Sequence, residues 1–514
     1  MQIDYKNIVI DVKEGTPVSE LLGDEIQKAK CKVIACKFNN EIKSLNFKIK
    51  ASGKLDLIDL NNKDGMRIYR RGLVYIISKA ISEVYPGALM TIKYQLSNAM
   101  YCTVDNLKIT NEVISNINKR VKEIIKQDLP IEKRFMTKDE AEEFYKKENT
   151  LKGKLQLDLK QKKEVTLYYC EDYYNYFYGV LPTSTGFAEA YEITKYSVGF
   201  LIRYPSKDNP YELSEFQDTP KLFATLEEYQ KLHRILNVNT LYKLNSIVKK
   251  GDIQEYVLLD EALHEKKIGA IADCIASNRK IKLIAIAGPS SSGKTTFAKR
   301  LGLQLRLNGL KPVIISVDNY FVEREQTPVD EEGKFDFESI HAIDTKLLNS
   351  DLVKLLAGEE IEAPTFNFHT GHKEYKGNKM KLAPDEVLVM EGIHCLNDDL
   401  TYLIPKDQKF KIYISCLTVL NIDYYNRIST TDTRLIRRIV RDYNFRGYSA
   451  THTLEMWPSV NRGEVNNIFK FQEEADCMFN SSLIYELSVL KKYAVPLLKE
   501  IDATSPLFTD GHIS

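Results

Sequence analysis

The sequence has few of the residues that build disulfide frameworks and metal cages. Eight of its 514 residues are cysteine, and they are scattered without a CxxC pair. Eight residues are histidine, and the first of them is His233. We therefore expect neither disulfide bonds nor a zinc cage, and a histidine-based catalytic or metal site is excluded from residues 1–225.

Long apolar runs and an excess of charge of one sign are also missing. No run reaches about eighteen apolar residues, and the first residues have neither the basic nor the apolar region of a signal peptide. The 72 Lys and Arg residues balance 71 Asp and Glu residues, which leaves a formal charge of +1. We expect a cytoplasmic protein without a membrane segment, in which any polyanion binding is local.

The patterning along the chain predicts four segments. Residues 1–60 alternate short strands with a helix near Val18–Leu22, as a small β-grasp module does. Residues 61–225 mix a helix near Tyr69–Tyr85 with a tyrosine-rich strand region and predict an α+β domain. A helical connector, residues 226–278, leads to residues 279–500, whose alternating strands and helices predict an α/β fold with a parallel sheet.

A P-loop opens this last segment. The sequence GPSSSGKT, residues 288–295, follows the apolar run Ile281–Ala287 and precedes a helical pattern. In such a loop backbone N–H groups surround phosphate oxygens, the lysine adds a point charge, and the hydroxyl after it can hold Mg²⁺. The predicted ATP-binding residues here are Gly288, Ser290, Ser291, Ser292, Gly293, Lys294, Thr295 and Thr296.

Two carboxylates follow apolar strands downstream of the P-loop. Lys311–Val317 predicts a buried parallel strand that ends at Asp318, and Glu386–Met390 predicts another that ends at Glu391. Because ligands lie beyond the carboxyl ends of such strands, both side chains are expected beside the P-loop. Asp318 is the candidate general base, Asp318 and Glu391 are candidate Mg²⁺ ligands together with Thr295, and a simple turn cap is the alternative for Asp318.

A run of arginines supplies the cations that phosphoryl transfer needs. Arg434, Arg437, Arg438 and Arg441 share one face of a predicted helix, and Arg446 lies just beyond it. We expect a lid in which Arg434 and Arg437 act in catalysis and Arg441 and Arg446 bind ATP. The alternative is a solvated arginine stripe.

The acceptor site is expected between the two carboxylate strands. Asp336 can bind two vicinal hydroxyls, and the rings of Phe366 and Phe368 can stack on a flat base, although core packing is an equal alternative for both phenylalanines. Tyr320 and His372 complete the candidate set, and an exposed loop role is the alternative for His369 and His372.

Together, these motifs resemble the uridine kinase family, within the group that includes phosphoribulokinase. The matching motifs are Asp318–Phe321, Phe335–Phe337, Pro364–Phe368, Glu391–Gly392 and Asp432–Asp442, within residues 280–490. The resemblance implies that Asp318 deprotonates a nucleoside 5′-hydroxyl, Asp336 holds the ribose, and Thr295 and Glu391 serve Mg²⁺. It also implies that Arg434, Arg437 and Arg446 grip phosphates. The base pocket departs from the family, with Phe366 in place of Tyr, Asn367 in place of Asp, and the histidine one residue late.

Residues 1–225 resemble the N-terminal half of threonyl-tRNA synthetases, which consists of a TGS module and an editing domain. The landmark is Asp64–Arg71, and the two positions of the paired histidines hold Arg71 and Tyr75. The resemblance therefore implies the fold without the editing chemistry. A scaffold or regulatory module is expected, and contact with RNA or a metabolite stays open. The tyrosines of residues 168–178 are either a half-buried strand or a stacking platform for bases.

These expectations combine into an ATP-dependent nucleoside 5′-kinase that uses ATP and Mg²⁺, with uridine or cytidine as the first acceptors to consider. One alternative is a phosphoribulokinase-like kinase for another small alcohol. The other is a regulatory nucleotide switch whose N-terminal half senses RNA or a metabolite. The sequence leaves a homo-oligomer open.

Overall fold

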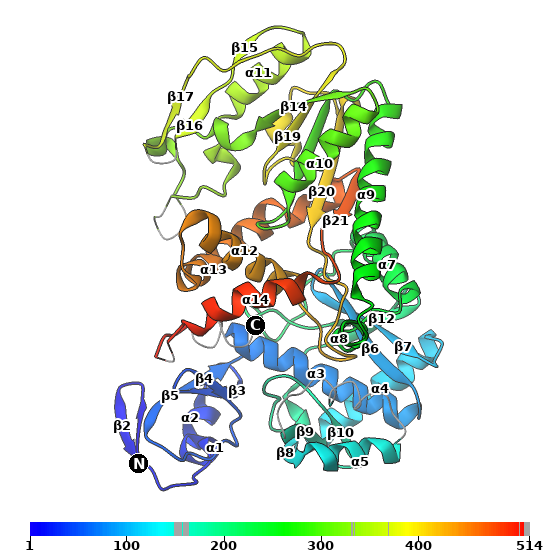
Figure 1. Ribbon diagram of the computed structural model, residues 1–514. Helices are drawn as coiled ribbons and strands as arrows, with labels where there is room; N and C mark the ends of the chain where they lie inside the picture. Colours follow the sequence, from blue (N-terminus) through cyan, green and yellow to red (C-terminus); the bar gives the residue numbers. More distant parts are fainter. Residues whose placement is uncertain are drawn as a thin grey trace.

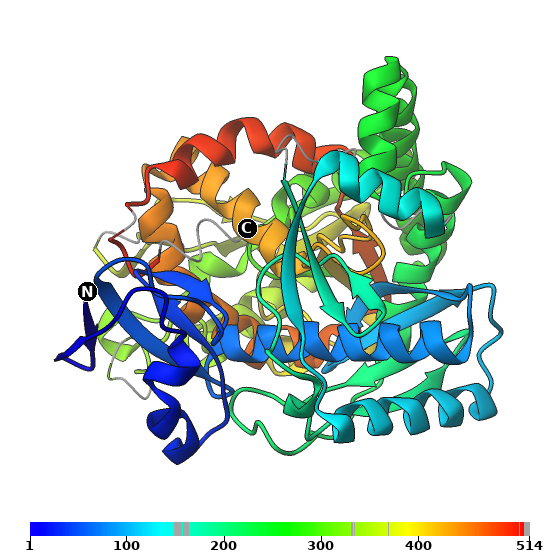
Figure 2. The ribbon, with the colours of Figure 1, turned by 90° about the horizontal axis from the view of Figure 1, so that it is seen from below.

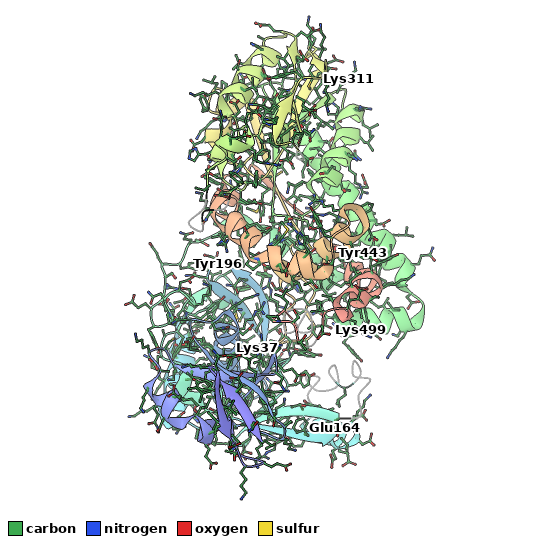
Figure 3. All side chains as sticks on the ribbon, turned by 90° about the vertical axis from the view of Figure 1, so that its left-hand side faces the viewer. Lys37, Glu164, Tyr196, Lys311, Tyr443 and Lys499 are labelled. Carbon is green, nitrogen blue, oxygen red and sulfur yellow. The ribbon has the colours of Figure 1, made fainter. Side chains whose placement is uncertain are left out.

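The computed structural model describes residues 1–148, 157, 164–329, 333, 335–367, 370–502 and 504–507. Figure 1 shows two stacked parts, with residues 1–225, which we call the front half, below the parallel-sheet part. In the side view of Figure 3, Lys311 lies near the top, whereas Lys37 and Glu164 lie in the front half. Within the described ranges, no helix has both the length and the apolar character needed to cross a membrane.

The first sheet contains five strands in the order β2-β1-β5-β3-β4. Its elements are β1 (Gln2–Tyr5), β2 (Ile8–Asp11), α1 (Val18–Leu21), α2 (Gly23–Lys28), β3 (Val33–Phe38), β4 (Glu41–Lys43) and β5 (Gly53–Asp59). Strands β1 and β5 are parallel, whereas the other neighbours are antiparallel. The predicted strands and helix are present, and the assignment of this module as a TGS-like β-grasp stays a prediction.

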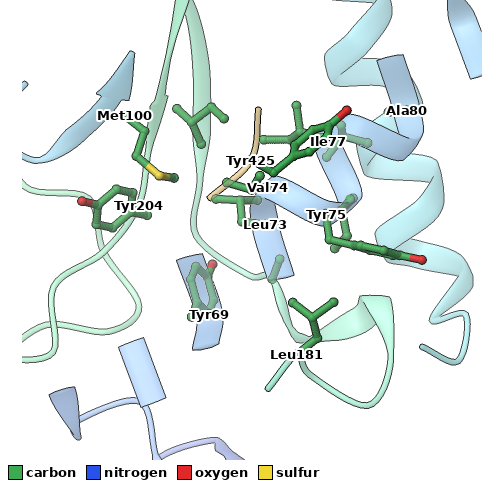
Figure 4. Packing of buried hydrophobic residues seen from close by; sticks show 14 of the residues in the cluster. Tyr69, Leu73, Val74, Tyr75, Ile77, Ala80, Met100, Leu181, Tyr204 and Tyr425 are labelled. Carbon is green, nitrogen blue, oxygen red and sulfur yellow. The ribbon is translucent and has the colours of Figure 1, made fainter. Parts of the chain in front are cut away.

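The rest of the front half packs around a long helix, α3. Its elements are α3 (Lys63–Val84), β6 (Leu89–Leu96), β7 (Ala99–Asp105), α4 (Asn111–Gln127), β8 (Glu132–Thr137), α5 (Lys138–Glu148), β9 (Glu164–Cys170), β10 (Tyr173–Asn175), β11 (Glu192–Tyr196) and β12 (Gly199–Arg203). They form a four-stranded sheet, β11-β12-β7-β6, and a three-stranded sheet, β10-β9-β8. Figure 2 shows α3 and α4 side by side, and Figure 4 shows the packing around Leu73, Val74 and Ile77 of α3.

The two positions at which the synthetases carry histidines hold side chains with structural contacts. The Tyr75 hydroxyl donates to the carbonyls of Tyr168 (3.1 Å) and Tyr173 (3.2 Å), and Arg71 donates to the Val180 carbonyl at 2.6 Å. Tyr168 itself is buried, as are Tyr174 and Tyr176 of the same hairpin. This burial favours the half-buried strand over a stacking platform for bases.

The predicted connector region contains three helices. They are α7 (Pro220–Ile235), α8 (Leu241–Lys250) and α9 (Ile253–Ser277), and the first of them begins six residues before the predicted bound at 226, which stays a prediction. Pro220 suits the first turn of that helix because the N–H it lacks would have no partner within the helix. Helix α9 runs up beside α10 of the parallel-sheet part (Figure 1).

The upper part contains a five-stranded parallel sheet in the order β14-β19-β13-β20-β21. Its main elements are β13 (Leu283–Ala287), α10 (Lys294–Leu307), β14 (Lys311–Ser316), α11 (Thr345–Leu356), β19 (Glu386–Glu391), β20 (Lys409–Ser415), α12 (Thr430–Arg446), α13 (Ala450–Asn467), β21 (Cys477–Asn480) and α14 (Glu486–Lys499). Alternate side chains of β13 enter two different apolar clusters, one on each face of the sheet. The predicted α/β fold with a parallel sheet is therefore confirmed.

One strand differs from its prediction. Strand β14 was expected to be buried, but it lies at the edge of the sheet, and Ile314 is 53% exposed. The edge position also explains how the strand accommodates Pro312, which has no backbone N–H to donate to a second neighbour. An apolar run of this length does not distinguish an edge strand from a central one.

Candidate active site

The strand register places the P-loop and both predicted carboxylates at one edge of the sheet. Glu391, the last residue of β19, pairs with Ile286 of β13 on one side and with Ser316 of β14 on the other. The P-loop leaves β13 directly after this point, and Asp318 lies two residues beyond the end of β14. The expected meeting of these groups beyond the carboxyl ends of the strands is therefore observed.

The P-loop approaches the neighbouring strand so closely that its first residue must be glycine. A Cβ atom on Gly288 would lie 2.0 Å from the carbonyl oxygen of Ile414. The Lys294 ammonium folds back over the loop and donates to the carbonyls of Gly288 (2.7 Å) and Pro289 (3.3 Å). Burial lowers the pKa of Lys294, while the nearby Glu391 and Asp318 carboxylates act in the opposite direction. The lysine thus carries its charge within the loop that is expected to hold phosphates.

Thr295 and Glu391 form a pair of oxygen donors at the start of α10. The Thr295 hydroxyl oxygen lies 3.1 Å from each of the two carboxylate oxygens of Glu391. Hydroxyl and carboxylate oxygens are the ligands that Mg²⁺ prefers, and it commonly takes one or two of them from protein and the rest from water and phosphate. The residues present therefore fit a Mg²⁺ ion bound together with a nucleotide.

Asp318 is available for chemistry. It lies in a short 3-10 turn, Val317–Tyr320, and its side chain does not cap that turn. Among the described residues, no hydrogen bond or ion pair engages its carboxylate, and the side chain is exposed to solvent. Partial desolvation raises the pKa of Asp318, and the charges of Lys294 and Arg446 oppose that rise. The turn-cap alternative therefore lacks support.

Arg434 has a different position from the one expected. Its side chain is 1% exposed, and its guanidinium donates to the Glu464 carboxylate (2.8 Å for Nη2) and to the Ser290 carbonyl (3.2 Å). Glu464 also accepts a hydrogen bond from the Ser290 N–H at 2.8 Å. The buried Arg434–Glu464 pair thus binds both the backbone N–H and the backbone carbonyl of Ser290 in the P-loop. The sequence had predicted that Arg434 contacts phosphate directly.

Two further arginines of α12 contact the P-loop. Arg437 donates to the carbonyls of Ser291 (3.3 Å) and Ser481 (2.8 Å) and pairs with Glu486. Arg438 donates to the Ser290 hydroxyl at 2.8 Å. The arginine face of α12 therefore lies on the P-loop, and the alternative of a solvated stripe is wrong for these side chains.

The remaining arginines of the helix gather around one buried carboxylate. Asp442 pairs with Arg438 (3.2 Å), Arg441 (2.7 Å) and Arg446 (3.6 Å). Arg446 is 52% exposed and lies near enough to Asp318 to influence its pKa. Asp442 was included in the lid motif predicted from the sequence, but its pairing with the arginines was not predicted, and neither Glu464 nor Glu486 was predicted.

The predicted acceptor residues differ in their burial and contacts. Asp336 is half-buried and accepts a hydrogen bond from the Glu338 N–H at 3.1 Å. Tyr320 is instead buried in the core with its hydroxyl 3.1 Å from Asp351, so the expectation of substrate contact is wrong for this conformation of the side chain. His372 is exposed and pairs with Glu323 at 2.6 Å.

Of the two phenylalanines predicted to stack on a base, only Phe366 lies within the described residues. Phe366 is 6% exposed and packs against Phe321 with ring centroids 5.5 Å apart, which favours the core-packing alternative. Phe368 and His369 lie outside the described residues. A carboxyl group that was not predicted, Glu338, lies next to the site, and burial together with the Glu464 charge raises its pKa to about 7. A base-stacking residue is therefore not identified among the described aromatic side chains of this loop.

The loop after β21 contacts both the P-loop and helix α9 of the connector. The Ser481 hydroxyl, just after β21, donates to the Ser292 carbonyl at 2.5 Å. Three residues later, the Ile484 N–H donates to the buried Asp260 carboxylate of α9 at 2.7 Å. Burial, reinforced by the charges of Glu486 and Glu261, raises the pKa of Asp260 to about 6. The loop beneath the P-loop is thus fixed by a carboxylate that is unfavourably charged at neutral pH.

Asp260→Asn should stabilise the protein at alkaline pH. Because the folded pKa of Asp260, about 6, exceeds the usual 3.8, folding favours the protonated form, and stability falls as pH rises through this window. The amide keeps an oxygen for the Ile484 N–H and removes the charge. We expect a gain of up to about 3 kcal/mol at pH 8 that vanishes near pH 4.

Chemical denaturation at the two pH values measures this difference. Asp208→Asn, at an exposed ion pair with Lys207, is the matched control and should change little at either pH. A destabilised Asp260→Asn protein at pH 8 would show that the carboxylate charge is favourable where it lies.

The fold and the site together define a P-loop kinase fold, in which a phosphate-binding loop and strand-end carboxylates share one edge of a parallel sheet. The model of the phosphoribulokinase / uridine kinase family matches residues 283–484. A uridine kinase of Ligilactobacillus salivarius is 30% identical over 188 residues, which are 36% of this chain and 78% of that protein. A uridine kinase of Mycoplasma genitalium is 30% identical over 178 residues, 35% of this chain and 74% of that protein. The chain belongs to the phosphoribulokinase / uridine kinase family, which indicates an ATP-dependent kinase.

The N-terminal part of the chain has a different relative. A threonine–tRNA ligase of Marinobacter nauticus is 27% identical over 164 residues, which are 32% of this chain and 26% of that protein. The resemblance to a synthetase therefore has a counterpart among known sequences, and it covers a quarter of the ligase. The chain thus joins a kinase of one family to a segment similar to part of another enzyme.

Proposed function

We propose that the protein is an ATP-dependent nucleoside 5′-kinase. The observation that carries the proposal is the combination, at one sheet edge, of a P-loop, the Thr295–Glu391 oxygen pair and an unengaged Asp318 carboxylate. A nucleotide switch needs the first two features to bind its nucleotide. A free carboxylate beside the lysine is what transfer to an alcohol additionally requires.

In this proposal each group has one role. The P-loop amides and Lys294 bind the phosphates of ATP, and Asp318 accepts the proton of the attacking hydroxyl. Thr295 and Glu391 would hold Mg²⁺, which when bound neutralises charge on the phosphates. Arg437, Arg441 and Arg446 would bind the phosphates, while Arg434 and Glu464 position the P-loop.

The acceptor is proposed to be a nucleoside, with uridine and cytidine as the first choices. Asp336 would bind the ribose hydroxyls, because a carboxylate accepts from two adjacent hydroxyls at once. The names of the kinase relatives support a uridine-type acceptor. The departures at Phe366 and Asn367 make the base the part of the substrate to determine first.

For the front half we propose a TGS-like module at residues 1–60 and an editing-like domain at residues 61–225 without editing chemistry. The connector would occupy 226–278 and the kinase domain 279–500. The similarity to a threonine–tRNA ligase supports this division. The contacts of Arg71 and Tyr75 give those side chains a structural role and support a module that does not hydrolyse aminoacyl-tRNA.

An acceptor panel tests the function. The full-length protein is incubated with ATP, Mg²⁺ and, separately, each ribonucleoside, deoxynucleoside and a set of sugar phosphates, and products are separated by chromatography. We expect phosphorylation of at least one ribonucleoside and weaker activity on its 2′- or 3′-deoxy analogue, because Asp336 would lose one hydroxyl. Phosphorylation of a sugar phosphate alone would replace the nucleoside with a phosphoribulokinase-like acceptor. Absence of any product would contradict the proposal.

A further inference from the structure

An irregular segment of the kinase part, just before α12, packs against the front half. Strand β20 ends at Ser415 and α12 begins at Thr430, and we call residues 416–429 between them the tether segment. Its apolar side chains do not join the two clusters that cover the parallel sheet. Leu417, Val419, Leu420 and Tyr425 are instead buried in clusters shared with the front half and the connector.

The first contact of the tether segment supplies hydrogen-bond partners for the backbone of an edge strand of the front half. Strand β6 lies at the edge of its sheet, and its register shifts between Ile92 and Tyr94. The Ile92 N–H donates to the Tyr424 carbonyl at 2.9 Å, and the Ile92 carbonyl accepts from the Asn421 amide at 2.6 Å. Because an open strand edge readily pairs with other backbone, these two bonds fix the tether segment at a defined position.

The second contact is a turn closed by Asp423 and Asn426. Asp423 Oδ1 accepts from the backbone N–H groups of Tyr425 and Asn426, both at 2.9 Å, and the Asn426 amide donates to both Asp423 oxygens. The side-chain oxygen of Asn426 then accepts from the Tyr178 N–H of the front half at 3.1 Å. Asn426 therefore uses its donor on its own turn and its acceptor on the other half of the molecule.

The third contact is the insertion of Tyr425 into the core of the front half. Its ring lies 5.8 Å from the ring of Phe177, and Figure 4 shows it beside Val74 and Ile77 of α3. Tyr425 is 7% exposed, so a large apolar surface of the kinase chain is covered only when the front half is present.

The tether segment leads directly into the arginine helix. Ser429 caps α12 by accepting from the N–H groups of Thr431 (3.1 Å) and Asp432 (3.4 Å). The Thr418 hydroxyl lies 2.9 Å from that of Thr433 in the first turn of the helix. The residues that follow Thr433 on α12 contact Ser290 and Ser291 of the P-loop through Arg434, Arg437 and Arg438. A continuous series of contacts thus joins Ile92 and Tyr178 of the front half to the P-loop.

We propose that the front half positions the arginine helix over the nucleotide through the tether segment, with Asn426 as a positioning residue. This proposal rests on the proposed function in one respect, that α12 neutralises phosphate charge. It assigns residues 1–225 a role in the kinase reaction itself. A ligand that altered the Ile92 or Tyr178 contacts would then alter phosphate binding.

Nucleotide binding tests this without requiring an acceptor. In Asn426→Ala, the Tyr178 N–H loses its acceptor and the Asp423 carboxylate loses the side-chain amide of Asn426, so α12 should dock less often on the P-loop. We expect the affinity for ATP to fall about tenfold and that for AMP to change less than twofold, because α12 is proposed to contact the β- and γ-phosphates that AMP lacks. Hydrogen exchange should accelerate in α12 and stay unchanged in α10. The matched control is Asn444→Ala on the same helix, where the exposed amide donates to the Val440 carbonyl of its own helix.

A second variant covers the case in which Asn426→Ala does not fold. Thr418→Val keeps the shape of the side chain and removes the bond to Thr433, and we expect an ATP-selective loss of about threefold. Equal losses for ATP and AMP, or unchanged ATP binding with unchanged exchange in α12, would overturn the proposal. If the acceptor panel yields no product while these binding changes occur, the proposed function fails and the positioning role stands.

Discussion

Asp318→Asn is expected to abolish nearly all phosphoryl transfer while ATP binding persists. General-base assistance contributes roughly 10²- to 10⁴-fold to a transfer reaction, so we expect kcat to fall by about 10³-fold. The amide keeps the size of the side chain but cannot accept the hydroxyl proton. Steady-state kinetics with the acceptor found in the panel, together with equilibrium ATP binding, measure the two effects separately.

The control for this variant is Asp407→Asn, an exposed carboxylate paired with Lys280 at 3.7 Å at the opposite end of the sheet from the P-loop. It should leave kcat unchanged. Near-normal turnover of Asp318→Asn would remove Asp318 from the role of base. A loss of ATP binding in parallel with kcat would instead assign Asp318 to the binding of nucleotide or Mg²⁺.

Glu464→Gln is expected to have the largest effect on stability. The substitution leaves Arg434, which is 1% exposed, with an uncompensated buried charge and weakens the acceptor of the Ser290 N–H. Removing one partner of a buried ion pair typically costs about 3–5 kcal/mol. Because the same carboxylate holds the P-loop, we expect ATP affinity to fall as well.

Denaturant unfolding with and without ATP measures both effects of Glu464→Gln. Glu474→Gln, on the exposed face of a nearby turn, is the matched control and should change the free energy of unfolding by less than about 0.5 kcal/mol. A Glu464→Gln protein as stable as the wild type would show that the pair with Arg434 is dispensable. Retained stability with weakened ATP binding would separate the P-loop contact from the ion pair.

The parts of the site that depend on strand ends were predictable from the sequence. Asp318 and Glu391 each follow an apolar run, and parallel strands deliver their carboxyl ends to one edge, so local pattern and topology gave the same answer. The P-loop was equally clear because its glycines and lysine stand in fixed order. These predictions need only the order of elements along the chain.

The predictions that failed depend on tertiary neighbours. Helical periodicity placed Arg434 on the same face as Arg437, but it could not show that Glu464, on a later helix, pairs with the buried Arg434 guanidinium. Tyr320 follows Asp318 closely in sequence, yet the 3-10 turn directs its ring to Asp351 in the core. Side-chain direction after a strand is set by the turn and by what packs beneath it.

The tether segment shows the same limit on a larger scale. Residues 416–429 read as a connection between a strand and the arginine helix, with no motif of their own. Their contacts with Tyr178 and Ile92 join positions 248 and 329 residues apart, and no local sequence pattern indicates such a pairing. The role that we propose for the front half therefore rests on these contacts and not on a sequence pattern.

The most direct test of the account is the position of the transferred phosphate. The wild-type protein is given ATP labelled in its γ-phosphate and the best nucleoside of the panel, and the product is examined by phosphorus and proton NMR. The account predicts the label on the 5′-oxygen of the nucleoside, with Asp318→Asn giving almost none of this product. Label found only in inorganic phosphate, or on a 2′- or 3′-hydroxyl, would contradict a nucleoside 5′-kinase built around Asp318.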